Sequence, residues 1–247
     1  MDAVETIVQL SAGGCAGAVN AVAGGGSLIS FPALLAIGYS PVAANVTNQV
    51  GLVPGYLGGT VGYRAELAGQ RTRARALGVT AALGAAAGTA LLLLAPPSSF
   101  RAILPYLVLA SCMALALQPA LTRAAGRHRA AHPGAPLHAG VFAASVYGGY
   151  FGGALGIVLL AILGALLIDD LQRLNALKGV LSFAGGIVAA AGYALFGPVH
   201  WGAAALIAAG ALVGGHTGAG LARRVRPDLL RWGIVAYGTA AAIILLV

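Results

Sequence analysis

Long stretches without a single charged residue dominate this sequence. The ranges 6–63, 76–100, 102–122, 130–168 and 179–222 contain no Asp, Glu, Lys or Arg. A helix needs about 20 apolar residues to cross the hydrocarbon core of a membrane, and each range is long enough. The chain has only 14 basic and 6 acidic residues among 247, too few to cover a soluble surface. The sequence therefore predicts a polytopic α-helical membrane protein, and excludes a soluble enzyme, a disordered chain and a nucleic-acid-binding protein.

Turn-forming residues divide the chain into apolar segments, whose lengths favour helices over strands. A basic linker, 122–137, separates a first transmembrane repeat, 1–121, from a second, 138–247. The eight predicted segments are 6–37, 42–63, 76–95, 100–121, 138–168, 174–196, 202–222 and 229–247.

The two halves align without a gap when position i is paired with position i+130, and we call this pairing the repeat register. Asparagine and Gly-Tyr matches are the most informative, because Ala, Gly and Leu match often by chance in an apolar chain. The matched pairs are Gly26 and Gly156, Asn45 and Asn175, Gly55 and Gly185, and Gly62-Tyr63 and Gly192-Tyr193. We interpret the repeat register as an internal duplication.

The basic loops indicate that the two repeats have opposite orientations. The loop after the second segment carries Arg64, Arg71, Arg73 and Arg75, whereas its counterpart 196–200 has no formal charge. The loop after the third segment is nearly neutral in the first half and basic in the second, at 223–226. Short basic loops stay in the cytoplasm. This places the linker 122–137 in the cytoplasm and the N-terminus outside.

Inverted repeats require an odd number of crossings in each repeat. The segments 6–37 and 138–168 would each be about 46 Å long as one straight helix, against a core of about 30 Å. Glycines interrupt both of them. We therefore predict that each repeat has a glycine-broken, re-entrant first segment followed by three transmembrane helices. Eight plain spans are the alternative, with the loop 223–228 violating the charge rule.

Inverted repeats with broken helices are typical of transporters that bind substrate near the midplane. Non-helical backbone at membrane depth lines a cavity or lies buried in protein. A half-helix that begins at Ser27 would direct its N-terminal N–H groups at an anion, and a second would begin near Gly156. The predicted substrate-binding residues at these breaks are Gly24, Gly25, Gly26, Ser27, Gly153 and Gly156. Close helix packing is the alternative role for glycines.

Polar side chains inside the apolar segments are the second group of candidates, since such residues are costly in a membrane. The predicted substrate-binding residues of this group are Asn45, Thr47, Asn48 and Gln49 in the first repeat, and Asn175, Lys178 and Ser182 in the second. Lys178 is the only lysine and would face an anion; alternatively, it reaches the interface near Asp169. Hydrogen bonds between the repeats are the alternative role for the asparagines.

His216 could relay protons within the seventh segment, because its charge changes near neutral pH; a packing role is the alternative. No catalytic, nucleotide-binding or metal-binding motif is present in the sequence. We therefore expect no enzymatic activity, no cofactor and no metal.

At these residues the sequence resembles the TauE/SafE sulfite exporter family of anion permeases. The resemblance is carried by Ala23-Gly24-Gly25-Gly26-Ser27-Leu28-Ile29-Ser30-Phe31-Pro32, by Ala43-Ala44-Asn45-Val46-Thr47-Asn48, by Tyr150-Phe151-Gly152-Gly153-Ala154-Leu155-Gly156 and by Leu174-Asn175-Ala176-Leu177-Lys178. It implies a transporter in the inner membrane of a prokaryote, with sulfite, sulfonates or related oxyanions as substrates and export as the usual direction. The second repeat departs from the first in having no proline at position 162.

The function expected from the sequence is alternating-access transport of a small anion through a site between the repeats. An anion channel with the same central site but no alternating gate is the alternative. The expected partners are the small anionic substrate and the lipid bilayer. The sequence is compatible with a homo-oligomer as well as with a monomer.

Overall fold

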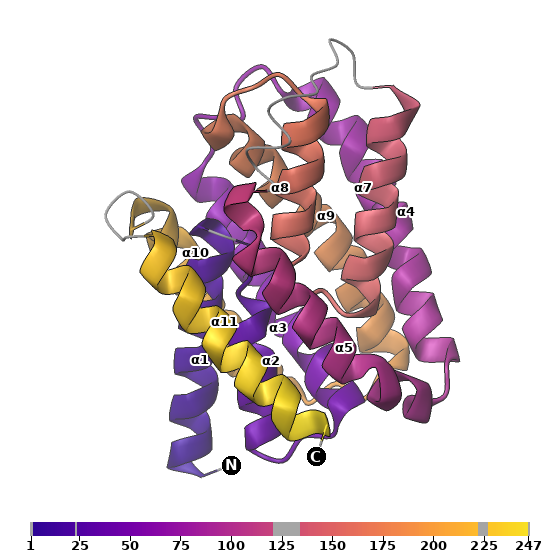
Figure 1. The fold of residues 1–247 in the computed structure, drawn as a ribbon, viewed down its shortest axis with the longest axis vertical. Coiled ribbons are helices and arrows are strands. Elements are labelled where there is room, and N and C mark those ends of the chain that lie inside the picture. The colour runs from indigo at the N-terminus through magenta and orange to yellow at the C-terminus, as the bar shows by residue number, and fades with distance from the viewer. Residues whose placement is uncertain (1, 23, 121–133, 222–226, 247) are drawn as a thin grey trace.

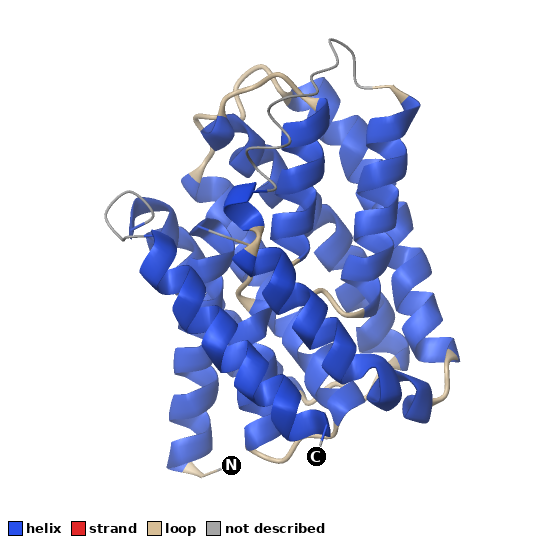
Figure 2. Cartoon of the chain, viewed as in Figure 1, coloured by secondary structure: helices blue, strands red, loops and turns tan. Residues whose placement is uncertain are grey.

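The computed structural model of the chain describes residues 2–22, 24–120, 134–221 and 227–246. Within these residues, helices are joined by short connections and no strand occurs (Figure 2). The prediction of an all-helical chain is therefore confirmed for the described part.

The same order of helices occurs in both halves of the chain. Each helix of the first half has a counterpart in the second at nearly the place that the repeat register gives, and α5 and α11 correspond residue for residue at both ends. The helices are α1 (Ala3–Val22), α2 (Ser27–Ala36), α3 (Pro41–Gly62), α4 (Arg71–Leu94) and α5 (Pro97–Ala116), followed by α7 (Ala135–Tyr150), α8 (Leu155–Leu166), α9 (Leu171–Phe196), α10 (Trp201–Leu221) and α11 (Pro227–Leu246).

Several expected boundaries differ from the structure by a few residues, and two of these differences concern the basic loops. Helix α4 begins at Arg71, not at residue 76, because arginine is a good helix former and the helix extends past its apolar part. Helix α7 begins at Ala135, so the last residues of the predicted linker 122–137 are helical, while 121–133 lie outside the described residues. The basic residues at 223–226 also lie outside them.

Both long apolar segments are divided into two helices at their glycines. The first breaks between Val22 and Ser27, and the second between Tyr150 and Leu155. The predicted helix starts at Ser27 and near Gly156 are thus confirmed to within one residue. In Figure 1, α1 and α2 lie towards the end of the molecule that holds both chain termini, and α7 and α8 lie towards the opposite end. We call these the lower and the upper end.

The helix pairs in contact also correspond between the halves. Helix α1 packs on α10 as α7 packs on α4, and α3 packs on α10 as α9 packs on α4. Helices α3 and α9 pack on each other, as do α5 and α11. Glycines permit the closest approaches: a Cβ on Gly88 would collide with the Val146 carbonyl oxygen, and one on Gly214 with that of Gly14. These glycines have the packing role that small residues commonly play between membrane helices.

The outer surface of the described residues is apolar. Leu94 is 85% exposed and Phe196 78%, as expected of side chains that face lipid. Helices α4, α5 and α9 are long and apolar enough to cross a membrane. Helix α3 is of similar length, but its polar residues lower its mean hydropathy. Length and composition therefore agree with a membrane protein.

Candidate functional site

The two helix breaks touch each other at the centre of the molecule. Gly24 has a φ of +83°, which favours glycine. A Cβ on Gly24 would lie 2.6 Å from Cα of Gly156, and a Cβ on Gly156 would lie 2.6 Å from Cα of Gly24. Neither position has room for a side chain, so this close packing requires glycine at both. This contact joins the first repeat to the second.

Asn20 closes the break between α1 and α2. Its Oδ1 accepts a hydrogen bond of 2.8 Å from the backbone N–H of Gly26. The N–H groups of Leu28 and Ile29 donate to the carbonyls of Gly25 and Gly26. These N–H groups at the start of α2 therefore already have partners within the protein, and an anion would have to displace Asn20 to reach that of Gly26.

Hydroxyl groups satisfy the carbonyls of the second break. The Tyr147 hydroxyl donates to the Gly153 carbonyl at 2.6 Å, and Ser27 Oγ donates to the Gly152 carbonyl at 3.2 Å. Ala154 adopts a φ of +57° at the start of α8. It is the equivalent of Gly24 in the repeat register, so the corresponding residue in each break has a left-handed backbone. Ser27 thus links the two breaks and is not a free ligand.

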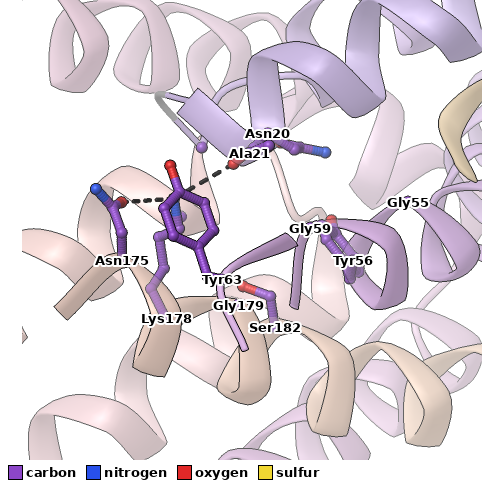
Figure 3. Close-up of a pocket in the computed structure, with 12 residues that line it drawn as sticks. Asn20, Ala21, Gly55, Tyr56, Gly59, Tyr63, Asn175, Lys178, Gly179 and Ser182 are labelled. Carbon is purple, nitrogen blue, oxygen red and sulfur yellow. Dashed lines mark hydrogen bonds between the residues drawn. The ribbon is translucent and has the colours of Figure 1, made fainter. Parts of the chain in front are cut away.

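Lys178 is the central charged residue of the site. It lies on α9 and is only 4% exposed. Its Nζ donates to Asn175 Oδ1 at 3.0 Å and to the Asn20 carbonyl oxygen at 3.3 Å, as Figure 3 shows. Among the described residues, no Asp or Glu carboxylate lies within 4.0 Å of this ammonium group. The structure contradicts the alternative in which Lys178 reaches the interface.

A small cavity surrounds this ammonium group at the junction of the two repeats (Figure 3). Its volume is about 20 Å³, which is enough for about one water molecule. The residues that line it are Asn20, Ala21, Gly24, Gly55, Tyr56, Gly59, Tyr63, Gly156, Asn175, Lys178, Gly179 and Ser182. We call this space the lysine cavity.

A second cavity of about 20 Å³ adjoins the first. Tyr56 and Ser182 line both cavities and therefore stand between them. The Tyr56 ring packs on α9 at Gly186, where a Cβ would lie 3.2 Å from the ring. Tyr56 and Gly186 are themselves equivalent in the repeat register, so the repeat places a tyrosine opposite a glycine. Gln49 lines this second cavity together with residues of α7 and α9.

The structure brings together part of the predicted set. Five predicted residues line the lysine cavity, namely Gly24, Gly156, Asn175, Lys178 and Ser182. Gln49 and Ser182 line the second cavity. Neither cavity is lined by Gly25, Gly26, Ser27, Asn45, Thr47, Asn48 or Gly153, so the assignment of these residues as substrate contacts stays a prediction.

Some of the remaining predicted residues make structural hydrogen bonds. Asn45 Nδ2 donates to the Tyr150 carbonyl at 3.0 Å, and Thr47 Oγ1 accepts from the backbone N–H of His200 at 3.0 Å. Asn45 thereby holds the end of α7, as Lys178 holds the end of α1. His216 is exposed on α10 and lines neither cavity, so the proton relay also stays a prediction.

Sequence reasoning missed Asn20, Tyr56 and Tyr63. Asn20 is a polar residue in an apolar segment, shortly before the glycine triplet, and this position was the available signal. Tyr63 was used only as a marker of the repeat. The place of Tyr56 between the cavities depends on the packing of α3 on α9, which the local sequence does not specify.

The ion pairs among the described residues form one cluster around Asp169, outside the lysine cavity. Asp169 Oδ2 lies 2.9 Å from Arg73 Nη1, and its Oδ1 lies 2.7 Å from Arg173 Nε. Partial burial acts to raise the pKa of Asp169, but the hydrogen bonds from Arg173 and Arg73 hold it below its ordinary value. Asp169 is thus occupied by arginines and does not neutralise Lys178.

Comparisons with known proteins agree with this arrangement. The family model described as sulfite exporter TauE/SafE matches residues 10–245. The chain is 27% identical over 213 residues to a probable membrane transporter protein of Haemophilus influenzae, covering 86% of this chain and 83% of the relative. It is 27% identical over 237 residues to the probable membrane transporter protein ORF9 of a Sinorhizobium species, covering 94% and 88%.

A third relative is the probable membrane transporter protein YfcA of Escherichia coli K12, 27% identical over 221 residues, with 89% of this chain and 81% of the relative covered. No solved structure matches the chain. The match to the family model extends over nearly the whole chain, including both helix breaks and Lys178. The chain therefore belongs to the sulfite exporter TauE/SafE family of membrane transporters.

Proposed function

We propose that this protein exports a small sulfur-containing or organic anion, such as sulfite or a sulfonate, across the cytoplasmic membrane of a prokaryote. The observation that carries the proposal is the buried Lys178 ammonium group beside a cavity, with no carboxylate partner in the described part of the chain. The family name agrees with this class of substrate.

The chemistry of Lys178 favours an anionic ligand. An ammonium group has three N–H donors, and two of them donate to the neutral oxygens of Asn175 and Asn20. Removing an unpaired charge from water costs several kcal/mol, which neutral acceptors offset only in part. An oxyanion in the cavity would supply the missing countercharge, with the Asn175 and Ser182 side chains beside it.

Alternating access is supported by the internal correspondence of the two halves. Helix bounds and helix contacts both recur in the repeat register. The α1–α2 pair and the α7–α8 pair lie towards opposite ends of the molecule in Figure 1, as inverted, re-entrant repeats would. In this proposal the two repeats move against each other about the contact between the helix breaks.

The small size of the lysine cavity supports a closed state. A volume of about 20 Å³ accommodates water but not an ion with three or more oxygen atoms. Binding therefore requires the walls to separate. Tyr56 and Ser182, which stand between the two cavities, would divide the path through the membrane in this state.

The positive-inside rule supports the proposed orientation. The connection between α3 and α4 and the start of α4 lie at the upper end in Figure 1, and this part of the chain carries Arg64, Arg71, Arg73 and Arg75. We therefore assign the upper end to the cytoplasm. Both chain termini lie at the lower end and would face the outside.

Uptake of ³⁵S-labelled sulfite into proteoliposomes tests the proposal. The wild type is expected to accelerate uptake over empty liposomes, and Lys178→Ala is expected to lose this acceleration while remaining folded. Arg75→Ala is the matched control, because Arg75 is exposed and lines neither cavity. Equal rates for Lys178→Ala and the wild type would contradict the proposed site.

A further inference from the structure

A third and much larger cavity lies at the upper end, away from the lysine cavity. Its volume is about 390 Å³, and it is formed where α4, α7 and α9 begin. Its walls include Gln70, Thr72, Arg73, Ala76, His138 and Arg173. None of these residues lines the lysine cavity or its neighbour. We call this space the arginine cavity.

The lining of the arginine cavity is positively charged. Arg73 and Arg173 line it, and no Asp or Glu among the described residues does. Both arginines contact the carboxylate of Asp169, and the neighbouring Asp170 caps the start of α9 by accepting from the backbone N–H of Gln172. The His138 ring bonds to Thr80 Oγ1 through Nδ1, at 2.7 Å, which leaves Nε2 as its second polar atom. Helices α4 and α7 begin here without a side-chain cap, and their N-terminal dipoles favour negative charge.

Gln70 supplies an unpaired acceptor in the wall of the arginine cavity. This residue is 2% exposed, and its Nε2 donates to the carbonyls of Glu66 at 2.9 Å and Arg173 at 3.1 Å. Its buried Oε1 has no partner among the described residues. A ligand that satisfies both this oxygen and the arginines carries an anionic group together with an O–H or N–H donor.

An exposed apolar track leads from the cavity along α4. Thr72 and Ala76 line the cavity, and Val79 and Leu83 continue the same helix face at helical spacing. Val79 is 62% exposed and Leu83 61%. This track fits an acyl chain, and a soluble phosphate compound would leave it uncovered.

We propose that the arginine cavity binds the headgroup of an anionic phospholipid whose alcohol carries free hydroxyls, such as phosphatidylglycerol. Its phosphate lies between Arg73 and Arg173, a headgroup hydroxyl donates to Gln70, and an acyl chain follows α4. Basic pockets between helices at the cytoplasmic surface are suited to such headgroups. Because α4 belongs to the first half and α7 and α9 to the second, the bound lipid ties the two halves together.

Unfolding temperatures of the full-length protein in detergent, with increasing amounts of added lipid, test this site. Dioleoyl phosphatidylglycerol is expected to raise the unfolding temperature of the wild type, whereas dioleoyl phosphatidylcholine is not. In Arg73→Gln the half-effective concentration of phosphatidylglycerol is expected to rise about fivefold, which is the usual contribution of one basic side chain to binding anionic lipid. Arg75→Gln is the matched control and should respond as the wild type, because Arg75 does not line the cavity.

A second variant, Thr72→Trp, places a large side chain in the cavity without changing charge and should also weaken the response. An unchanged phosphatidylglycerol response in both Arg73→Gln and Thr72→Trp would overturn the proposal. Equal weakening in Arg75→Gln would also overturn it, since general surface attraction would then explain the effect. Equal stabilisation by soluble glycerol 3-phosphate would identify a soluble phosphate compound as the ligand and overturn the lipid assignment.

Discussion

Replacing Lys178 by methionine should separate its role in transport from any role in stability. Methionine has a similar length and no charge. The substitution removes two hydrogen bonds from a charged donor, worth about 1.5–3 kcal/mol each. It also removes the cost of burying an ammonium group, which amounts to several kcal/mol. Water in the cavity can replace the lost donors, so we expect the free energy of unfolding to change by no more than about 2 kcal/mol.

The expected effect on transport is far larger. Two unit charges 4 Å apart attract each other by about 4 kcal/mol at an effective dielectric constant of about 20. Losing this attraction weakens anion binding by about 1,000-fold, since 1.4 kcal/mol corresponds to a factor of ten.

Thermal unfolding in detergent and ³⁵S-sulfite uptake in proteoliposomes measure the two effects on one preparation. We expect Lys178→Met to unfold within about 8 °C of the wild type and to show no uptake above empty liposomes. Lys178→Arg keeps the charge and should retain part of the uptake. Wild-type uptake per folded molecule in Lys178→Met would refute the reasoning and leave Lys178 with a structural role only.

Three further predictions concern the framework of the site. Gly24→Ala should destabilise the protein by about 2–4 kcal/mol, because its φ is positive and its Cβ would collide with Gly156; Gly233→Ala, which meets no neighbour within 4 Å, should be neutral or slightly stabilising in the same denaturation assay. Asn45→Ala should lower the free energy of unfolding by about 1–3 kcal/mol, because a carbonyl at the end of α7 loses its donor; an unchanged unfolding temperature would contradict this. The pKa of Asp169 in the folded protein lies below its unfolded value of about 4. Its contribution to the free energy of unfolding is therefore complete above that pH and disappears as pH falls through the folded pKa. The difference in unfolding temperature between the wild type and Asp169→Asn should shrink below about pH 4.

The sequence predicted the helix breaks because glycine readily adopts backbone conformations that interrupt a helix. The triplet Gly24-Gly25-Gly26 lies in a segment too long for one span, and α2 begins immediately after it, at Ser27. Asn175 and Lys178 are three residues apart on one helix and therefore share a face, and in the structure Lys178 Nζ donates a hydrogen bond to Asn175 Oδ1.

Contacts between distant parts of the chain could not be predicted in the same way. Gly24 and Gly156 lie in different halves of the chain, and nothing in either local sequence specifies that they touch. The same reason explains why Asn20 was missed and why Asn45 was assigned to substrate. Asn45 and Asn175 are equivalent in the repeat register, but their roles differ. Asn45 donates to the Tyr150 carbonyl, whereas in the second repeat Lys178, the counterpart of Asn48, donates to the equivalent carbonyl of Asn20. Asn175 instead accepts from Lys178 and lines the cavity.

Counterflow of labelled sulfite tests the central claim most directly, because the claim is that two repeats expose one anion site alternately to the two sides. Proteoliposomes loaded with unlabelled sulfite are diluted into a trace of ³⁵S-sulfite. The account predicts a transient accumulation of label above its equilibrium level, driven by exchange through the alternating site and absent in Lys178→Met. Label that enters at the same rate with and without internal sulfite, and never exceeds equilibrium, would contradict the account and indicate a channel.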